Sequence, residues 1–254
     1  MAATRCSLLF ALLLVGCDQE QPAGRAEDLP HAACEEQAFE KSRFTVCRYD
    51  PASHRLEMFA EARDGTPLRS FEKLEAHLGK RASDLLFAMN AGMFDEDGRP
   101  IGLYVEAGNR TRPINLRRGG GNFHLMPNGV FAINRQGKTL VMPSEGFAAS
   151  NPAVEWATQS GPMLVIEGKL HPAFDQNGES LHVRNGVGAC RGGVAWFAIS
   201  DEPVSFGRFA RLFKDKLHCR NALFLDGAVS SLWEAGVRQD QRAPLGPMVA
   251  VFRR

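Results

Sequence analysis

Two segments of this chain are apolar at nearly every position over the length of a β-strand. They read "GVAWFAIS" at 193–200 and "NALFLD" at 221–226. A strand with one face in water alternates apolar and polar residues, so a continuous apolar run indicates a strand covered on both faces. These runs predict a central sheet with further layers packed on it, and they argue against a sandwich that is open to water.

Other segments of strand length are separated by turns that contain glycine. The segment 129–142, "GVFAINRQGKTLVM", predicts a hairpin that closes at a glycine turn. With the two runs above, the predicted strands are 44–49, 56–60, 85–89, 102–105, 130–133, 163–166, 194–199, 222–225 and 248–252.

Two further segments have the apolar spacing of helices, and Ser70 and Ser205 precede them as capping residues. Their apolar faces are Phe71, Leu74 and Leu78 in the first, and Phe206, Phe209, Phe213 and Leu217 in the second. We interpret the phenylalanine stripe as core packing. The predicted fold class is α+β, with a large mixed or antiparallel sheet and a few packed helices in a single domain.

The charge balance excludes one class of partner. The chain has 254 residues, 44% of them hydrophobic, with 30 basic and 29 acidic side chains. This composition is sufficient for a sizeable core. Because no basic block stands out, the electrostatic signature of a nucleic-acid-binding protein is missing.

The first residues have the composition of an export signal. Arg5 precedes an apolar run at 8–15 that is too short to span a bilayer, and Gly16 and Cys17 follow it. The end of this segment resembles a bacterial lipobox, so we predict a signal peptide at 1–17 with Cys17 lipidated. The alternative is an ordinary secretory signal. With lipidation, the protein would be anchored to the membrane of the cell envelope and face the periplasm.

Residues 18–33 are polar and rich in proline and alanine, so we predict a flexible tether, followed by one domain at 34–254. Outside the signal and anchor, the cysteines are Cys34, Cys47, Cys190 and Cys219. An even count in an oxidising compartment indicates disulfides. We predict a Cys34–Cys47 pair, because these residues are close in sequence and flank one strand. Cys190 with Cys219 is the second predicted pair, and the alternative pairings stay open. No cysteines or histidines have the spacing of zinc ligands.

Polar turns with glycine follow apolar strands four times, in "FAMNAGMF", "ATQSGPMLV", "HVRNGVGA" and "LFLDGAVSS". Convergence of these strand ends would form one polar site, although such residues are also common in ordinary turns. The chain lacks the Gly-x-Ser-x-Gly elbow, the phosphate loop and the His-Glu-x-x-His helix. The glycines at 119–121 follow Arg117 and Arg118 and could surround an anion; a flexible loop is the simpler interpretation.

The order of several segments along the chain resembles the phosphodiester glycosidase family, in its bacterial periplasmic branch, from about residue 87 to residue 252. The segments are "NAGMFDEDGRPIGLYVEAG", "NFHLMPNGVFAI", "ATQSGPMLVIEGKLHPAF", "RNGVGA", "VAWFAISDEPVSF" and "NALFLDGAVSSLW". Members of this family hydrolyse the bond between the anomeric carbon of a sugar and a phosphodiester oxygen. The resemblance therefore implies a hydrolase whose substrate is a glycosyl phosphodiester or an envelope glycan. We predict that it needs no cofactor.

The resemblance also implies a set of site residues: Asn90 and Gly92; Gln159, Ser160 and Gly161; Arg184 and Gly188; and Asp226, Gly227 and Ser230. The family commonly has Asp-Gly-Gly-Gly-Ser where this chain has Asp-Gly-Ala-Val-Ser, so Ala228 and Val229 restrict this turn and leave the identity of the sugar open.

These residue types suit the chemistry. A phosphomonoester is a good leaving group, so the reaction depends on a cation at the phosphate and a carboxylate at the sugar. We assign these roles to Arg184 and Asp226, with Asn90, Gln159 and Ser230 orienting hydroxyls and Glu106 as a reserve carboxylate. The alternative for Asp226 is a turn former or helix cap.

Two other functions fit the same residues. A membrane-tethered protein that binds glycans or glycosyl phosphates without cleaving them would use the same polar groups. A phosphodiesterase that breaks the phosphorus–oxygen bond would usually need a metal, and no ligand cluster is evident. Asp95 and Asp97 could bind a structural calcium ion, but we favour a solvated turn.

Overall fold

The structure is a computed structural model that describes residue 1 and residues 33–234, 237–239 and 243–254. The predicted signal peptide, Cys17 and nearly all of the predicted tether lie outside the described residues. None of the helices in this part of the chain is long and apolar enough to cross a membrane.

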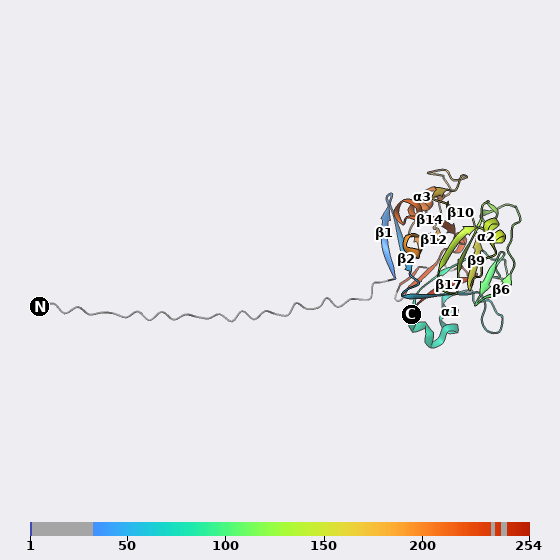
Figure 1. The fold of residues 1–254 in the computed structure, drawn as a ribbon, viewed down its shortest axis with the longest axis horizontal. Helices are drawn as coiled ribbons and strands as arrows, with labels where there is room; N and C mark the ends of the chain where they lie inside the picture. Colours follow the sequence, from blue (N-terminus) through green and yellow to red (C-terminus); the bar gives the residue numbers. More distant parts are fainter. Residues whose placement is uncertain (2–32, 235–236, 240–242) are drawn as a thin grey trace. The chain divides into compact units, whose positions relative to one another are not determined.

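The largest sheet has seven strands and contains both continuously apolar runs (Figure 1). Its strand order is β1-β2-β13-β12-β14-β10-β11, and every neighbouring pair is antiparallel. The strands are β1 (Cys34–Phe39), β2 (Ser42–Tyr49), β10 (Met163–Ile166), β11 (Lys169–Leu170), β12 (Asn185–Cys190), β13 (Ala195–Ser200) and β14 (Cys219–Phe224). Strand β13 is buried at five of its six positions, as its apolar sequence predicts.

Two five-stranded antiparallel sheets complete the fold, in the orders β16-β15-β4-β17-β3 and β6-β5-β9-β7-β8. The first consists of β3 (His54–Phe59), β4 (Leu85–Asn90), β15 (Leu232–Glu234), β16 (Val237–Gln239) and β17 (Met248–Arg253). The second consists of β5 (Tyr104–Glu106), β6 (Asn109–Arg112), β7 (Gly129–Ile133), β8 (Thr139–Pro143) and β9 (Trp156–Ser160). The predicted hairpin at 129–142 is confirmed as β7–β8.

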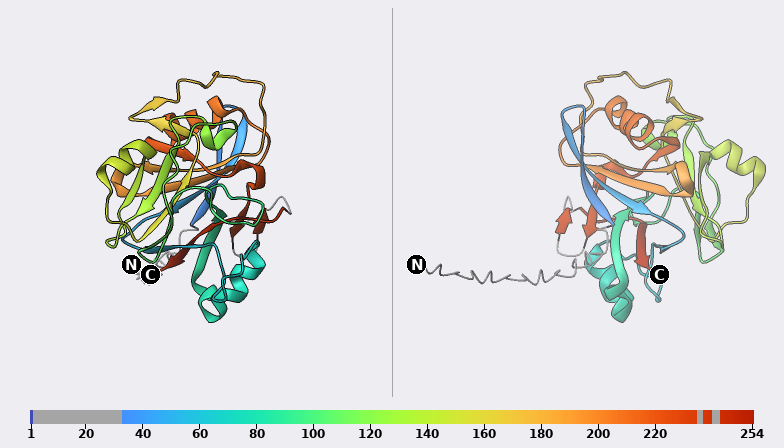
Figure 2. Two further views of the ribbon diagram at one scale, coloured as in Figure 1. Left: turned by 90° about the vertical axis from the view of Figure 1, so that its right-hand side faces the viewer. Right: turned by 60° about the vertical axis from the view of Figure 1, so that its left-hand side comes forward.

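Both predicted helices are present, and Figure 2 shows them at different sheets. Helix α1 (Phe71–Leu78) is capped by the Ser70 hydroxyl and packs on strands of the β4 sheet. Helix α3 (Phe206–Arg211) is capped by Ser205, continues as a π-helical turn to Lys216, and packs on the seven-stranded sheet. The short helix α2 (Ser144–Ser150) was not predicted, because no side chain caps it and Phe147 is its one large buried residue.

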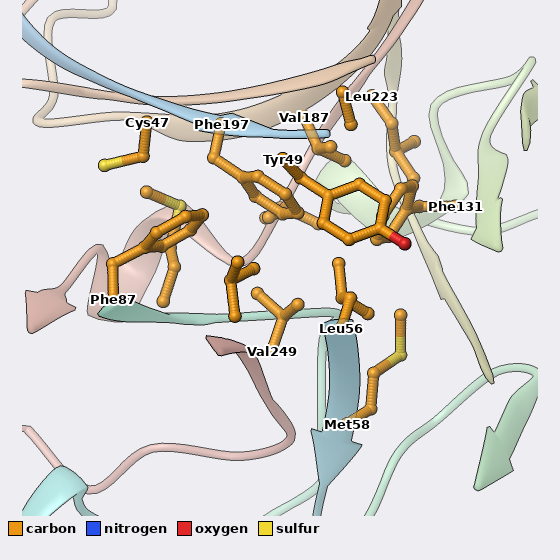
Figure 3. Close-up of a cluster of buried hydrophobic side chains, with 14 of the residues drawn as sticks. Cys47, Tyr49, Leu56, Met58, Phe87, Phe131, Val187, Phe197, Leu223 and Val249 are labelled. Atoms are coloured by element: carbon orange, nitrogen blue, oxygen red, sulfur yellow. The ribbon is translucent and has the colours of Figure 1, made fainter. Parts of the chain in front are cut away.

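The three sheets share one apolar core (Figure 3). Phe197 of β13 lies at its centre, with ring centroids 5.5 Å from Phe87 of β4 and 5.4 Å from Phe131 of β7. Each of these three rings comes from a different sheet, and both pairs have the edge-to-face geometry that aromatic rings favour. The α+β class in a single domain is confirmed, with the strands distributed over three antiparallel sheets.

Two disulfides join neighbouring strands. The predicted Cys34–Cys47 pair connects β1 to β2, and Cys190–Cys219 connects β12 to β14. Disulfides are typical of proteins that fold outside the cytosol, in the periplasm or the extracellular space.

We expect the double substitution Cys190→Ala and Cys219→Ala to lower the free energy of unfolding by about 3 to 4 kcal/mol. The sequence separation is 29 residues, and a crosslink over a loop of this length removes that much entropy from the unfolded chain. Urea titrations of the variant and the wild type would measure the difference. A variant within about 1 kcal/mol of the wild type would contradict this expectation.

Candidate functional site

Three successive residues at the end of β14 hold the polar turns of the chain together. Their backbone N–H groups donate to carbonyl oxygens in three different turns: Phe224 to Pro162 at 3.0 Å, Leu225 to Asn185 at 3.1 Å, and Asp226 to Ala91 at 3.0 Å. The four turns that follow apolar strands in the sequence therefore meet at one place.

A network of buried amides fixes this meeting point. The Asn90 side chain donates to the Asp226 carbonyl at 2.8 Å and accepts from the backbone N–H of Ser231 at 2.8 Å. The Asn185 side chain donates to Asn90 Oδ1 at 2.9 Å and accepts from the Ser230 hydroxyl at 3.1 Å. All five residues belong to the converging turns, and satisfied polar networks of this kind rigidify the structure around them.

Asn185 was missed by the sequence analysis. It stands in one of the four turns, directly after Arg184, but the resemblance pointed to the neighbouring arginine and to Gly188. Its position between a basic residue and a glycine is common in solvent-exposed turns, so only the three-dimensional contacts show that it bridges Asn90 and Ser230.

The Asp226 carboxyl lies at the edge of the network and is partly exposed. Its Oδ1 accepts a hydrogen bond from the Ala228 N–H at 3.1 Å and so caps the short 3₁₀ turn Gly227–Val229. Burial raises the pKa of this carboxyl above its ordinary value of 3.8. Within the described chain no cation pairs with it. The capping role is therefore present, and among the described residues it leaves the second carboxylate oxygen without a donor.

The Arg184 guanidinium is buried, with 1% of the residue exposed. Nε donates to the Val204 carbonyl at 2.8 Å, and Nη2 donates to the Ser180 carbonyl at 2.7 Å. The carbon of the guanidinium lies 3.5 Å from the centroid of the Phe206 ring and 5.5 Å from that of Phe224. Burial lowers the pKa of Arg184 to about 10. Among the described residues no carboxylate pairs with this charge.

Gln159 and Ser160, at the end of β9, differ in how their polar groups are used. The Gln159 amide oxygen accepts from the N–H groups of Leu103 and Asn115, and its nitrogen donates to the Asn115 carbonyl and the Ser144 hydroxyl. Its amide is thus bonded within the protein. The Ser160 hydroxyl is buried and has no hydrogen-bond partner in the described structure.

The predicted glycines are required by close packing. A Cβ at Gly92 would overlap the Gln159 carbonyl oxygen, and one at Gly227 would overlap the Phe224 ring. At Gly161 a Cβ would lie 2.7 Å from the Asn128 side chain. These three glycines stand in the converging turns. Gly188 does not: it lies within β12, where a Cβ would lie 2.6 Å from Cys219 Sγ.

The remaining acidic residues singled out in the sequence lie apart from the network. Glu106 accepts a hydrogen bond from the Tyr104 hydroxyl at 3.1 Å, and burial raises its pKa. No interaction in the described structure joins Glu106 to the converging turns. Asp95 accepts from the Arg99 N–H at 2.9 Å, and Asp97 pairs with the Arg99 side chain at 3.2 Å, which closes a turn.

The site thus combines the partly exposed Asp226 carboxyl and the buried Arg184 cation, which are linked through one aromatic ring. Gly227, next to Asp226, lies against the Phe224 ring, and the carbon of the Arg184 guanidinium lies 5.5 Å from the centroid of the same ring. A carboxylate with a raised pKa binds a proton more readily than an ordinary aspartate does, and a desolvated guanidinium suits binding of an anion. Such a pair can act on a neutral sugar that is linked to an anionic group.

The chain is similar to known proteins in sequence and in fold. A model of the phosphodiester glycosidase family matches residues 83–252. An uncharacterized protein of Escherichia coli K12, YigE, is 33% identical over 225 residues, which cover 87% of each chain. The fold is similar to the catalytic domain of zebrafish N-acetylglucosamine-1-phosphodiester alpha-N-acetylglucosaminidase, auto-inhibited by its pro-peptide, with a TM-score of 0.58, 17% identity, and coverage of 87% of this chain and 81% of that one. A hypothetical protein from Synechocystis gives a TM-score of 0.54 and 16% identity, over 87% of this chain and 61% of that one.

Proposed function

The chain belongs to the phosphodiester glycosidase family, and from this premise we propose that it hydrolyses the glycosidic bond of a sugar-1-phosphodiester in the cell envelope. The products are the free sugar and a phosphomonoester. The zebrafish protein of similar fold bears the name of an enzyme for N-acetylglucosamine-1-phosphodiesters, which makes this class of diester the first substrate to test.

The observation that carries the proposal is the position of Asp226. Its carboxyl stands where the polar turns meet, with one oxygen unbonded within the described protein and a raised pKa. In the proposed step a water oxygen attacks the anomeric carbon while the bond from that carbon to the phosphate oxygen breaks. The Asp226 carboxylate takes the proton of the water or stabilises the positive charge on the sugar, and the bonding electrons leave with the phosphate.

Arg184 is the proposed contact for the phosphate. A buried guanidinium without a carboxylate costs free energy, and a phosphate would supply the missing negative charge. Asn90, Asn185 and Ser230 support the site by positioning, because their side chains bind one another and the Asp226 carbonyl. Direct contact of Asn90, Gln159 or Ser230 with a substrate stays a prediction.

Two features support the proposed place of the reaction. The disulfides support export, and the predicted lipidation of Cys17 would attach the domain to the membrane on its periplasmic side. We propose that the substrate is a glycosyl phosphodiester of the envelope, and that hydrolysis needs no cofactor because the phosphomonoester leaves readily.

The test is an assay of the purified protein with an N-acetylglucosamine-1-phosphodiester, with and without EDTA, in which the products are separated. We expect free N-acetylglucosamine in both cases. Sugar-1-phosphate would show cleavage of the phosphorus–oxygen bond and refute the proposal. Binding without any product, over a panel of such diesters, would instead favour a protein that binds glycosyl phosphates without cleaving them.

A further inference from the structure

One segment in the middle of the near-neutral chain lacks acidic residues. Residues 107–144 contain no aspartate or glutamate, whereas the whole chain has 29 acidic residues against 30 basic ones. The basic residues of the segment are Arg110, Arg112, Arg117, Arg118, Arg135 and Lys138. A local excess of one charge on a neutral protein creates a potential that attracts an oppositely charged ligand.

Three of these arginines line one pocket of about 650 Å³, which we call the arginine pocket. Arg112, Arg117 and Arg118 contribute to its wall together with His124, and Asp95 is the one acidic residue in the lining. The Asp95 carboxylate already accepts a hydrogen bond from the Arg99 N–H at 2.9 Å. The charged side chains of the pocket therefore sum to a net positive charge.

The three guanidinium groups are available for a ligand. Within the described structure, the guanidinium groups of Arg112, Arg117 and Arg118 form no ion pair and no hydrogen bond. Arg117 donates only through its backbone N–H, to Asn115 Oδ1 at 3.1 Å. Two arginines outside the pocket lining are paired: Arg99 with Asp97 at 3.2 Å and Arg135 with Glu155 at 3.1 Å. Unpaired guanidinium groups that line a concavity are suited to bidentate binding of phosphate oxygens.

The wall of the pocket is tied to the candidate site. Asn115, in the lining, bonds the Gln159 amide through both its N–H and its carbonyl, at 2.9 and 2.7 Å. Its side chain donates to the Ile101 carbonyl at 2.9 Å, and the Ile101 N–H donates to the Met93 carbonyl at 3.1 Å. The arginine pocket is thus built on the same two turns that carry Gly92 and Gln159.

We propose that the arginine pocket binds a second phosphate group of the substrate, on the alcohol side of the bond that is cleaved. This inference rests on the proposed function and extends it. The substrate is then a chain with repeated phosphodiester links, and not a single diester of a small alcohol. The scissile phosphate occupies the site at Asp226 and Arg184, while a further phosphate of the same chain binds Arg112, Arg117 and Arg118.

The first experiment measures binding and does not depend on turnover. A short poly(glycerol phosphate) chain, which carries phosphodiester charges and no sugar, is titrated into the protein by calorimetry. We call the triple variant Arg112→Gln, Arg117→Gln, Arg118→Gln the pocket variant. We expect it to bind at least about 30-fold more weakly than the wild type, since charge-assisted hydrogen bonds are lost. The matched control is Arg110→Gln, Arg135→Gln, Lys138→Gln, which removes the same charge from the same segment outside the pocket and should change binding less than about 3-fold.

The second experiment compares two substrates that differ by one phosphate. N-acetylglucosamine-1-phosphodiesters of glycerol and of glycerol phosphate are given to each variant. We expect the wild type to have a KM about 10-fold lower for the second substrate, with similar kcat, and the pocket variant to lose that difference. The KM of the pocket variant for the first substrate should match that of the wild type.

The outcomes separate this inference from the proposed function. Equal loss of binding in the pocket variant and the control, or no binding by the wild type, would overturn the assignment of the pocket. Equally tight binding of an oligogalacturonate would show that carboxylates are accepted and would overturn the choice of phosphate. If no diester is cleaved but poly(glycerol phosphate) binding depends on the pocket arginines, the proposed function fails while the pocket remains a phosphate site.

Discussion

Asp226→Asn is expected to lower kcat/KM on a sugar-1-phosphodiester by about 10²- to 10⁴-fold, the range typical for loss of a proton-transfer group. The amide keeps the acceptor oxygen that binds the Ala228 N–H, so the 3₁₀ turn at Gly227–Val229 should survive. It cannot accept a proton from water at neutral pH. Steady-state kinetics of the two purified proteins would measure the change.

Glu106→Gln is the matched control for this substitution. Glu106 is also a carboxyl with a pKa raised by burial, but it accepts its hydrogen bond from the Tyr104 hydroxyl, outside the converging turns. We expect its activity to stay within about 3-fold of the wild type, as for a residue outside the reacting groups. If Glu106→Gln loses as much activity as Asp226→Asn, or if Asp226→Asn stays active, the assignment of the catalytic carboxylate is wrong.

The pH dependence of the wild type follows from the same pKa. Burial raises the pKa of Asp226, so the reactive carboxylate is lost as the pH falls through a value above 3.8. The pH at which kcat/KM falls on the acid side should therefore be higher than for an ordinary aspartate. Asp226→Asn should lack this fall.

The effect of the same pKa on stability has the opposite sign. A raised pKa in the folded state favours folding at low pH, and this contribution is lost as the pH rises. Asp226→Asn should thus not destabilise the fold at neutral pH.

The strands were the most predictable part of the structure, for a physical reason. Continuous burial leaves a continuous apolar pattern, and the run at 193–200 became β13, buried on both faces. The sequence of the strand does not indicate which residues pack on its two faces. Phe197 contacts one ring from each of two other sheets, and these partners, Phe87 and Phe131, are more than 60 residues away. The division into three sheets therefore could not be read from the strands themselves.

The candidate site was predictable in its turns and less so in its contacts. Glycine after an apolar strand indicated where polar groups would gather, and the bonds from Phe224, Leu225 and Asp226 join three of those turns. The use of each side chain depends on neighbours distant in sequence. The Gln159 amide is bonded by Asn115 and Ser144, and Asn185 is bonded by Asn90 and Ser230. Neither set of partners produces a periodic pattern in the sequence, so sequence analysis could not identify it.

Asn185→Asp is expected to cost about 3 kcal/mol or more of the free energy of unfolding at pH 7, although the two side chains have the same shape. The Asn185 nitrogen donates to both oxygens of Asn90, at 3.1 and 2.9 Å, in a fully buried position. A carboxylate has no hydrogen to donate, so one of its oxygens would face the two Asn90 oxygens, and among the described residues the Ser230 hydroxyl would be the one side-chain donor left to the buried negative charge. Denaturant titrations would measure the loss.

Asn109→Asp is the control, because Asn109 is exposed and the same chemical change there should alter stability by less than about 0.5 kcal/mol. The pH provides a second check. A buried carboxylate that faces two acceptors has a raised pKa in the folded state, and its protonated form can donate to Asn90. The stability deficit of Asn185→Asp should therefore shrink between pH 7 and pH 5. If the loss in the free energy of unfolding does not depend on pH, it comes from packing. The amide network then does not hold Asn90 and the Asp226 backbone in place.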